Sequence, residues 1–90
     1  MFKTLEELIE VIRNRKESSL KESYTKKLLN DKKLITEKVK EEITELIDAI
    51  EKNTNKVHEA ADVLYHLMVL LEANGIKIED VMAELKKRQK

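Results

Sequence analysis

Apolar residues recur along this chain at intervals of three and four residues, the spacing that places them on one face of an α-helix. The chain contains no proline and a single glycine, so long helices can form almost anywhere along it. We find no sustained alternation of apolar and polar residues bounded by turn residues, which argues against β-strands. The pattern predicts five helices, at about residues 4–16, 20–29, 32–52, 56–73 and 78–87.

Turn and capping residues separate the predicted helices. Ser19 and Glu22 match a capping box at the start of the second helix. Residues 53–55 (Asn-Thr-Asn) form a short turn, and Asn74-Gly75 closes the fourth helix because both residues tolerate the left-handed conformation. We therefore expect an all-α fold, an antiparallel bundle of about five helices. The apolar stripe of the third helix, which predicts its packing face, consists of Ile35, Val39, Ile43, Leu46, Ile47 and Ile50.

The fourth predicted helix carries acidic groups on an otherwise apolar surface. Of the 15 residues from Val57 to Leu71, 11 are apolar or tyrosine, which is typical of a helix at the centre of a bundle. At about 100° per residue, Glu59, Asp62 and His66 fall within an arc of about 60°. Carboxylates are rarely buried unless they are paired or bind a metal ion. This line of polar groups therefore requires a counter-charge.

The third predicted helix supplies a second acidic pair. Glu42 and Glu45 lie three residues apart and so share one helix face. Because the following turn is short, folding the two helices as a hairpin can bring this pair opposite Glu59 and Asp62. Four facing carboxylates repel one another, and a hard divalent cation resolves the repulsion. All-oxygen ligation selects Mg²⁺, Mn²⁺ or Ca²⁺ over zinc, so the pattern predicts a Mg²⁺ site for a phosphorylated ligand.

Composition narrows the expected partners and location. Ninety residues form one domain, residues 1–90, with a modest core that oligomerisation commonly enlarges. The 18 basic residues balance the 18 acidic ones and aromatic residues are only 3%, so nucleic acid is not an expected partner. The absence of cysteine excludes disulfides and thiolate metal sites. The apolar runs are too short to span a membrane and no secretory signal is evident, so we expect a cytoplasmic protein.

Several segments together resemble a known family. Residues 41–45 (Glu-Glu-Ile-Thr-Glu), followed by residues 59–66 (Glu-Ala-Ala-Asp-Val-Leu-Tyr-His), resemble the signature of the phosphoribosyl-ATP pyrophosphohydrolases. That family is similar in turn to the wider group of MazG-like, all-α nucleoside triphosphate pyrophosphohydrolases. Residues 23–25 (Ser-Tyr-Thr), 38–39 (Lys-Val) and 75–81 also agree, so the resemblance covers nearly the whole chain.

The resemblance implies an enzyme of histidine biosynthesis. Its reaction is the second step of that pathway, the hydrolysis of phosphoribosyl-ATP to phosphoribosyl-AMP and pyrophosphate, with Mg²⁺, or Mn²⁺ in its place, as the cofactor. It also implies an active site formed with a second subunit, in a homodimer or higher homo-oligomer. Because no cyclohydrolase domain fits in 90 residues, we expect a stand-alone form that works with a separate phosphoribosyl-AMP cyclohydrolase.

Catalysis by this site needs a base and cationic groups that bind phosphate. A carboxylate outside the ligand set, or loosely bound, can take the proton from an attacking water, and Glu41 is our candidate for this base. Lys38 lies one turn before Glu42 and can reach a phosphate. Lys26 can do the same from the second helix.

Hydroxyl and imidazole groups complete the predicted set of substrate ligands. Ser23, Tyr24 and Thr25 can add hydrogen bonds to the substrate, although Tyr24 also sits at a spacing that fits helix packing. His66 lies one turn after Asp62. It is interpreted either as a hydrogen-bonded core residue that orients this carboxylate or as a substrate ligand.

Two other functions are compatible with these residues. The metal site also fits a house-cleaning pyrophosphohydrolase that acts on a non-standard nucleotide. The helical pattern alone fits a non-catalytic oligomerisation or adaptor module. Separately, Glu59 and Asp62 can be interpreted as partners of lysines from another helix in structural salt bridges. A rise of the melting temperature on adding Mg²⁺ separates a specific metal site from such a module.

Overall fold

Five α-helices make up the described part of the chain. The computed structural model describes residues 1–17 and 23–89. The helices are α1 (Lys3–Glu17), α2 (Tyr24–Leu29), α3 (Lys32–Lys52), α4 (Lys56–Ala73) and α5 (Ile78–Arg88). No strand occurs within those two ranges, so the all-α prediction is confirmed. None of the helices in the described ranges combines the length and hydrophobicity needed to cross a membrane.

The second helix begins later than its sequence pattern predicts. Its predicted capping box, Ser19 with Glu22, lies outside the described residues. In the structure Ser23 is the N-cap, and its hydroxyl accepts a hydrogen bond from the backbone N–H of Lys26 at 3.3 Å. Asp31 caps α3 in the same way through the N–H of Leu34 at 3.0 Å. Two side-chain caps therefore fix the corner between α2 and α3.

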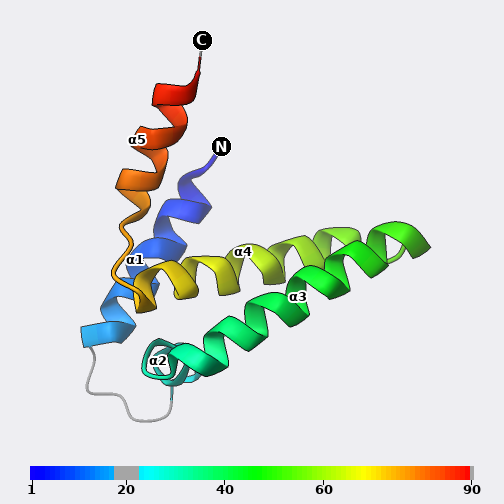
Figure 1. The fold of residues 1–90 in the computed structure, drawn as a ribbon, viewed down its shortest axis with the longest axis horizontal. Coiled ribbons are helices and arrows are strands. Elements are labelled where there is room, and N and C mark those ends of the chain that lie inside the picture. The colour runs from blue at the N-terminus through cyan, green and yellow to red at the C-terminus, as the bar shows by residue number, and fades with distance from the viewer. Residues whose placement is uncertain (18–22, 90) are drawn as a thin grey trace.

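A tight turn folds α3 back on α4, and the two helices form a long antiparallel arm (Figure 1). Asn53 and Asn55 take the left-handed conformation, with φ of 55° and 44°. Asparagine tolerates this conformation better than most residues because its side chain can hydrogen-bond locally. At the other end of α4, Gly75 has φ of 69° and the Ile76 N–H bonds to the Leu71 carbonyl at 2.9 Å. Both predicted turns are thus confirmed.

The hydrophobic core sits at one end of the arm, where α1 and α2 pack against it. It joins residues from four helices, and each fully buried aliphatic side chain contributes about 1.5–3 kcal/mol. The buried cluster consists of Ile12, Leu28, Leu29, Ile35, Val39, Met68 and Val69. The far half of the arm, toward the turn, lies beyond the reach of α1 and α2 (Figure 1).

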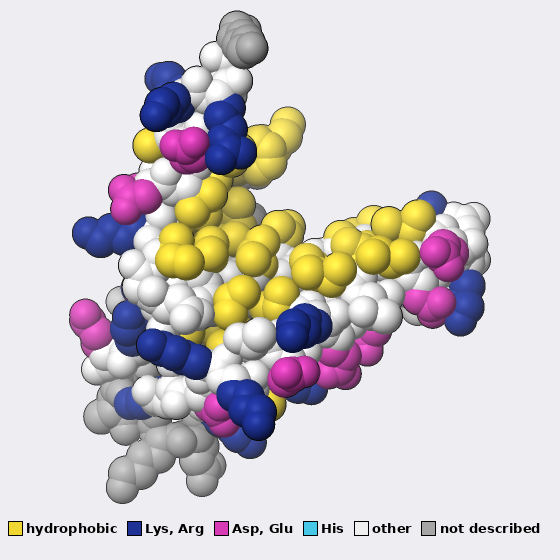
Figure 2. All heavy atoms as spheres, in the orientation of Figure 1, with side chains coloured by type: hydrophobic (Ala, Val, Ile, Leu, Met, Phe, Trp, Pro, Cys, Tyr) yellow, Lys and Arg dark blue, Asp and Glu magenta, His cyan; other side chains and the backbone are white. Residues whose placement is uncertain are grey.

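The apolar stripe of α3 is only partly buried. Ile35 and Val39 are in the core, but Ile43, Ile47 and Ile50 keep 42%, 52% and 56% of their surface exposed. Hydrophobic side chains gather along the arm and in the corner between the arm and the upright pair α1 and α5 (Figure 2). One copy of the chain has too few helices to cover the outer half of the arm. The exposed large apolar residues of the arm are Ile43, Ile47, Ile50, Val57 and Leu64.

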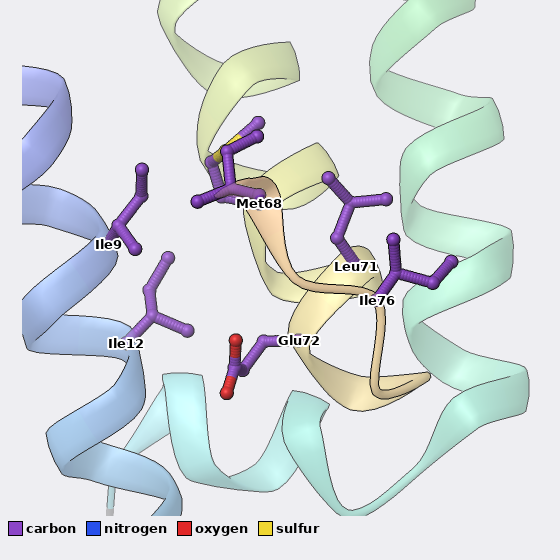
Figure 3. Close-up of a pocket in the computed structure, with 7 residues that line it drawn as sticks. Ile9, Ile12, Met68, Leu71, Glu72 and Ile76 are labelled. Carbon is purple, nitrogen blue, oxygen red and sulfur yellow. The ribbon is translucent and has the colours of Figure 1, made fainter. Parts of the chain in front are cut away.

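An ionic contact ties α5 to α1. Arg13 donates two hydrogen bonds to the Glu79 carboxylate, at 2.9 and 2.5 Å, and its Nε lies 3.6 Å from Glu72. The guanidinium lowers the pKa of Glu79 to about 2. Beside this contact, residues of α1, α4 and the segment before α5 enclose a small, mainly apolar space (Figure 3). Its volume of about 10 Å³ is that of roughly one water molecule, so it is a packing seam rather than a nucleotide site.

Candidate metal-binding active site

The α3–α4 arm brings two acidic pairs together from facing helices. Carboxylate oxygens of Glu42 and Glu45 on α3 and of Glu59 on α4 lie within 4.8 Å of one another. Asp62, Glu59 and His58 form a second group, whose ligand atoms also lie within 4.8 Å of one another. The hairpin geometry is what the spacing of the two acidic pairs predicts. Glu59 belongs to both groups and lies between them.

Two of these carboxylate oxygens are shielded from solvent without a partner. Oε2 of Glu42 and Oε2 of Glu59 receive no hydrogen bond from the described residues. Burial raises the pKa of Glu42, and the negative charge of Glu45 raises it further. The pKa of Glu59 is raised for the same two reasons in the same order. Shielded oxygens that repel one another and lack donors fit a divalent cation, which would be bound by both groups.

Lysine salt bridges do not account for the acidic cluster. The ion pairs among the described residues do not include Glu42, Glu45 or Glu59. Asp62 pairs with His58, whose Nε2 lies 3.4 Å from Oδ2 of the carboxylate. A structural network of acidic residues with lysines, the simpler interpretation of Glu59 and Asp62, is therefore not what the described residues form.

His66 is buried beside the cluster and connects α4 to α2. It is 6% exposed, and its Nδ1 lies 2.8 Å from the backbone carbonyl oxygen of Asp62. Because a carbonyl oxygen only accepts, Nδ1 carries the hydrogen, and Nε2 accepts from the Tyr24 hydroxyl at 3.1 Å. His66 thus contacts the backbone of Asp62 and not its carboxylate. Its ring also packs edge-on against Tyr65, with centroids 4.9 Å apart.

The Ser-Tyr-Thr segment at the start of α2 is held against the same side of α4. The Thr25 hydroxyl hydrogen-bonds to the Tyr65 hydroxyl at 2.5 Å, and the rings of Tyr24 and Tyr65 stack with centroids 6.4 Å apart. Burial raises the pKa of Tyr24, and the nearby charge of Lys38 opposes this rise. The charge of Glu42 also raises the pKa of Tyr24, so Tyr24 lies close to the acidic cluster. Ser23 instead uses its side chain as the cap of α2.

Glu41 and Lys38 lie beside the cluster and pair with each other. The Lys38 Nζ is 3.4 Å from Oε2 of Glu41, and this contact raises the pKa of Lys38. Glu41 belongs to neither group of converging carboxylates. Lys26 lies in α2, next to the segment just described. The roles of Glu41 as a base and of both lysines as phosphate ligands stay predictions.

Sequence reasoning gave no role to two residues that the structure places at the site. His58 is exposed, as its position near the helix start indicates, yet it contacts Asp62. The spacing of four residues between them is a signal that can be read from the sequence. Tyr65 is the hydrogen-bond partner of Thr25. Nothing in its own periodicity indicates a contact with α2, because that contact depends on how α2 crosses α4.

A helical hairpin that presents E-x-x-E against E-x-x-D, with shielded and unpartnered oxygens between them, defines an all-α protein with a candidate site for a divalent cation. Comparison with known proteins agrees. The family model for phosphoribosyl-ATP pyrophosphohydrolase (PRA-PH) matches residues 5–89. The chain is 47% identical over 92 residues to a phosphoribosyl-ATP pyrophosphatase of Clostridium novyi, covering 96% of this chain and 81% of that one. This chain belongs to the phosphoribosyl-ATP pyrophosphohydrolase family.

Relatives of two lengths occur. A phosphoribosyl-ATP pyrophosphatase of Bacillus cytotoxicus is 47% identical over 94 residues, with 98% of this chain and 85% of that protein covered. The histidine biosynthesis bifunctional protein HisIE of Pyrococcus furiosus is 45% identical over 87 residues, which cover 96% of this chain. This chain spans only 41% of the length of that bifunctional relative. The resemblance seen in the sequence is confirmed at the level of the family.

Proposed function

We propose that this chain hydrolyses phosphoribosyl-ATP to phosphoribosyl-AMP and pyrophosphate with a Mg²⁺ ion. The observation that carries the proposal is the convergence of acidic side chains from α3 and α4 around two shielded oxygens that lack donors. Membership of the family supports the choice of substrate. The proposed ligands are Glu42, Glu45, Glu59 and Asp62, and Mn²⁺ can replace Mg²⁺ in such an all-oxygen set.

The residues around the cluster would position the substrate and move one proton. A bound Mg²⁺ supplies charge neutralisation at phosphate oxygens and orients water. The hydroxyls of Tyr24 and Thr25 can donate to phosphate once they exchange their present partners, His66 and Tyr65. Lys38 can do so once it releases Glu41, and that carboxylate is then free to accept a proton from water. In this proposal the ion pair keeps the base, Glu41, and the phosphate ligand, Lys38, next to each other before substrate binds.

His66 acts in this proposal through its neighbours. Its Nδ1–H is fixed by the Asp62 carbonyl, so Nε2 is an acceptor directed at the Tyr24 hydroxyl. This bond determines where the Tyr24 hydroxyl points when substrate is absent. His66 is therefore a hydrogen-bonded core residue, although it holds the backbone of Asp62 and does not orient its carboxylate; a contact with substrate stays a prediction.

A second copy of the chain is the proposed cover for the exposed arm. Ile43, Ile47 and Ile50 follow one another along α3, next to the acidic residues on the same helix. An apolar row of this kind marks an association surface. A homodimer formed there would bury the row and bring a second protomer close to the metal ligands. The active site would then be shared between subunits, as the family resemblance implies.

The proposed reaction also implies a neighbour in metabolism. Its product, phosphoribosyl-AMP, is the substrate of a cyclohydrolase. The relatives from Pyrococcus furiosus and Arabidopsis thaliana are bifunctional histidine biosynthesis proteins, of which this chain covers 41% and 33%. We propose that this chain works with a separate phosphoribosyl-AMP cyclohydrolase, in the cytoplasm.

Pyrophosphate release tests the proposal directly. The protein is incubated with phosphoribosyl-ATP, with and without Mg²⁺, and with a panel of nucleoside triphosphates including non-standard ones. We expect Mg²⁺-dependent release from phosphoribosyl-ATP above all others, and its loss in Asp62→Asn with an unchanged helical spectrum. Preference for a non-standard nucleotide would favour the house-cleaning alternative. No turnover of any substrate would favour the oligomerisation module, for which the exposed apolar arm is sufficient.

A further inference from the structure

The hydroxyl group of Tyr65 on α4 reaches the first turn of α2. We propose that Tyr65 is a positioning residue, which holds the Thr25 hydroxyl in the direction from which it donates to a substrate phosphate. The proposal rests on the proposed function, in which Thr25 is a phosphate ligand. That function gives Tyr65 itself no task, and its periodicity in the sequence does not indicate one.

Two neighbouring residues of α4 each hold one of two neighbouring residues of α2. The hydroxyl oxygens of Tyr65 and Thr25 lie 2.5 Å apart, and the Tyr24 hydroxyl lies 3.1 Å from Nε2 of His66. Besides burial, the charge of Glu42, a proposed cation ligand, raises the pKa of Tyr24. The start of α2 is therefore next to the acidic cluster, and the two contacts fix its side chains there.

Other residues anchor α2 as a helix. A helix of six residues is not stable by itself, so tertiary contacts must hold it. Leu28 and Leu29 at its end are 0% and 7% exposed and belong to the core, whereas Tyr24 at its start is 50% exposed. Because the core already holds the helix, the hydroxyl of Tyr65 is not needed for that purpose. What its hydrogen bond fixes is the side chain of Thr25.

The ring of Tyr65 is itself held in place, so its hydroxyl is a fixed point. The ring stacks on Tyr24 with an interplanar angle of 17° and meets His66 edge-on, with an interplanar angle of 87°. A tyrosine side chain has few rotatable bonds, so contacts on two sides are enough to fix it. The Thr25 side chain can instead rotate between staggered conformations. The fixed hydroxyl of Tyr65 selects one of them.

The two hydroxyl groups can reverse the direction of their hydrogen bond. Each has one hydrogen to donate and lone pairs that accept. When Thr25 turns its hydrogen toward a phosphate, Tyr65 can donate its own hydrogen to the same Oγ1, so the contact persists while substrate is bound. A phenol is a stronger donor than an alkyl hydroxyl, which favours this direction. Tyr65→Phe removes this donor and keeps the ring contacts.

A double-mutant cycle tests whether Tyr65 acts through Thr25. Values of kcat/KM for phosphoribosyl-ATP with Mg²⁺ are measured for wild type, Tyr65→Phe, Thr25→Val and the double variant. We expect Tyr65→Phe to lower kcat/KM by about three- to tenfold, the range that one hydrogen bond represents. Thr25→Val should lower it by at least as much, and the double variant should be no worse than Thr25→Val alone. Losses that multiply, or no loss in Tyr65→Phe, would overturn the proposal.

Thr36→Val is the matched control. It removes a hydroxyl whose hydrogen bond, to the Lys32 carbonyl at 2.7 Å, stays within α3. It should leave kcat/KM unchanged, alone or combined with Tyr65→Phe. All variants should keep the helical spectrum and the stabilisation by Mg²⁺ that wild type shows. Loss of that stabilisation in Tyr65→Phe would mean that the residue supports the metal site instead, which would contradict the proposal.

A second readout needs no turnover. Three-bond NMR couplings report the χ1 conformation of Thr25, and we expect one conformation in wild type and an average over several in Tyr65→Phe. Unchanged couplings would overturn the proposal. If wild type releases no pyrophosphate from phosphoribosyl-ATP, the proposed function fails, whereas the couplings still show whether Tyr65 holds Thr25. The two failures are thus distinguishable.

Discussion

Replacing Glu42 by glutamine tests whether the cluster is destabilising when no cation is bound. Oε2 of Glu42 is shielded and unpartnered within the described residues, and the neighbouring charge of Glu45 adds repulsion. A buried polar atom without a partner costs about 1–3 kcal/mol. Glutamine removes the negative charge and supplies a donor for Glu45. We therefore expect Glu42→Gln to raise the free energy of unfolding of the Mg²⁺-free protein by about 1–3 kcal/mol.

Mg²⁺ should reverse the order of stability, so that wild type becomes more stable than Glu42→Gln. A ligand present at a hundred times its dissociation constant stabilises the folded state by about 2.7 kcal/mol. Wild type should gain about this much, whereas Glu42→Gln lacks one of the proposed ligands and should gain little. For a domain of this size each kcal/mol corresponds to about 4–8 °C in melting temperature. Thermal melts should therefore give the higher melting temperature for Glu42→Gln with a chelator and for wild type with Mg²⁺.

The pH dependence supplies an independent check of the same reasoning. Burial raises the pKa of Glu42 above its ordinary value of 4.5, so the folded protein binds this proton more readily than the unfolded chain does. The destabilisation is fully present above the raised pKa and is relieved as the pH falls toward 4.5. Metal-free wild type should thus gain stability over this range, and Glu42→Gln should show less of the gain.

Glu41→Gln is the matched control for these melts. It makes the same change of charge one residue away, at a carboxylate outside the converging groups, whose exposed pair with Lys38 contributes about 0–1 kcal/mol. Its unfolding curve should respond to Mg²⁺ like that of wild type. If Glu42→Gln is less stable than wild type without Mg²⁺ and equally stabilised by it, the cluster is not a cation site.

Three further changes test other parts of the structure. Ile47→Lys places a charge on the exposed row of α3 and should convert the proposed homodimer to monomers, as measured by analytical ultracentrifugation; an unchanged mass would place the interface elsewhere. Arg13 lowers the pKa of Glu79 to about 2, so the attachment of α5 should be intact above pH 4.5 and weaken as the pH falls toward 2. Hydrogen exchange in α5 should show this loss in wild type and not in Glu79→Gln. Ile35→Ala, at a fully buried position, should lower the free energy of unfolding by about 2–5 kcal/mol in denaturant titrations.

The parts of the fold that depend on local chemistry could be predicted well. The third and fourth helices begin and end where the turn residues indicate, because Asn53 and Gly75 adopt the left-handed conformation that few other residues tolerate. The second helix is the exception. Two serines, Ser19 and Ser23, precede candidate helical segments, and the structure uses Ser23 as the cap. Capping patterns alone do not show which of the two serines begins the helix.

The parts of the fold that depend on tertiary contacts between helices could be predicted less well. The periodic stripe of α3 indicates an apolar face but not what covers it, so Ile35 and Ile47 look alike in the sequence and differ in the structure. That the two acidic pairs face each other could be predicted, because only a short turn separates the helices that carry them. The contacts of Tyr65 and His66 with α2 could not be predicted, because they depend on how helices that are distant in the sequence cross each other.

The polar residues of α4 occupy successive turns of one uninterrupted helix. Glu59 and Asp62 come first, and Tyr65 and His66, which hold Thr25 and Tyr24, follow directly. A tilt or slide of this helix would move Glu59 and Asp62 together with the residues that hold Tyr24 and Thr25, and it would change their distances to Glu42 and Glu45 on α3. How closely α4 packs on α3 therefore sets the distance between the two halves of the proposed ligand set.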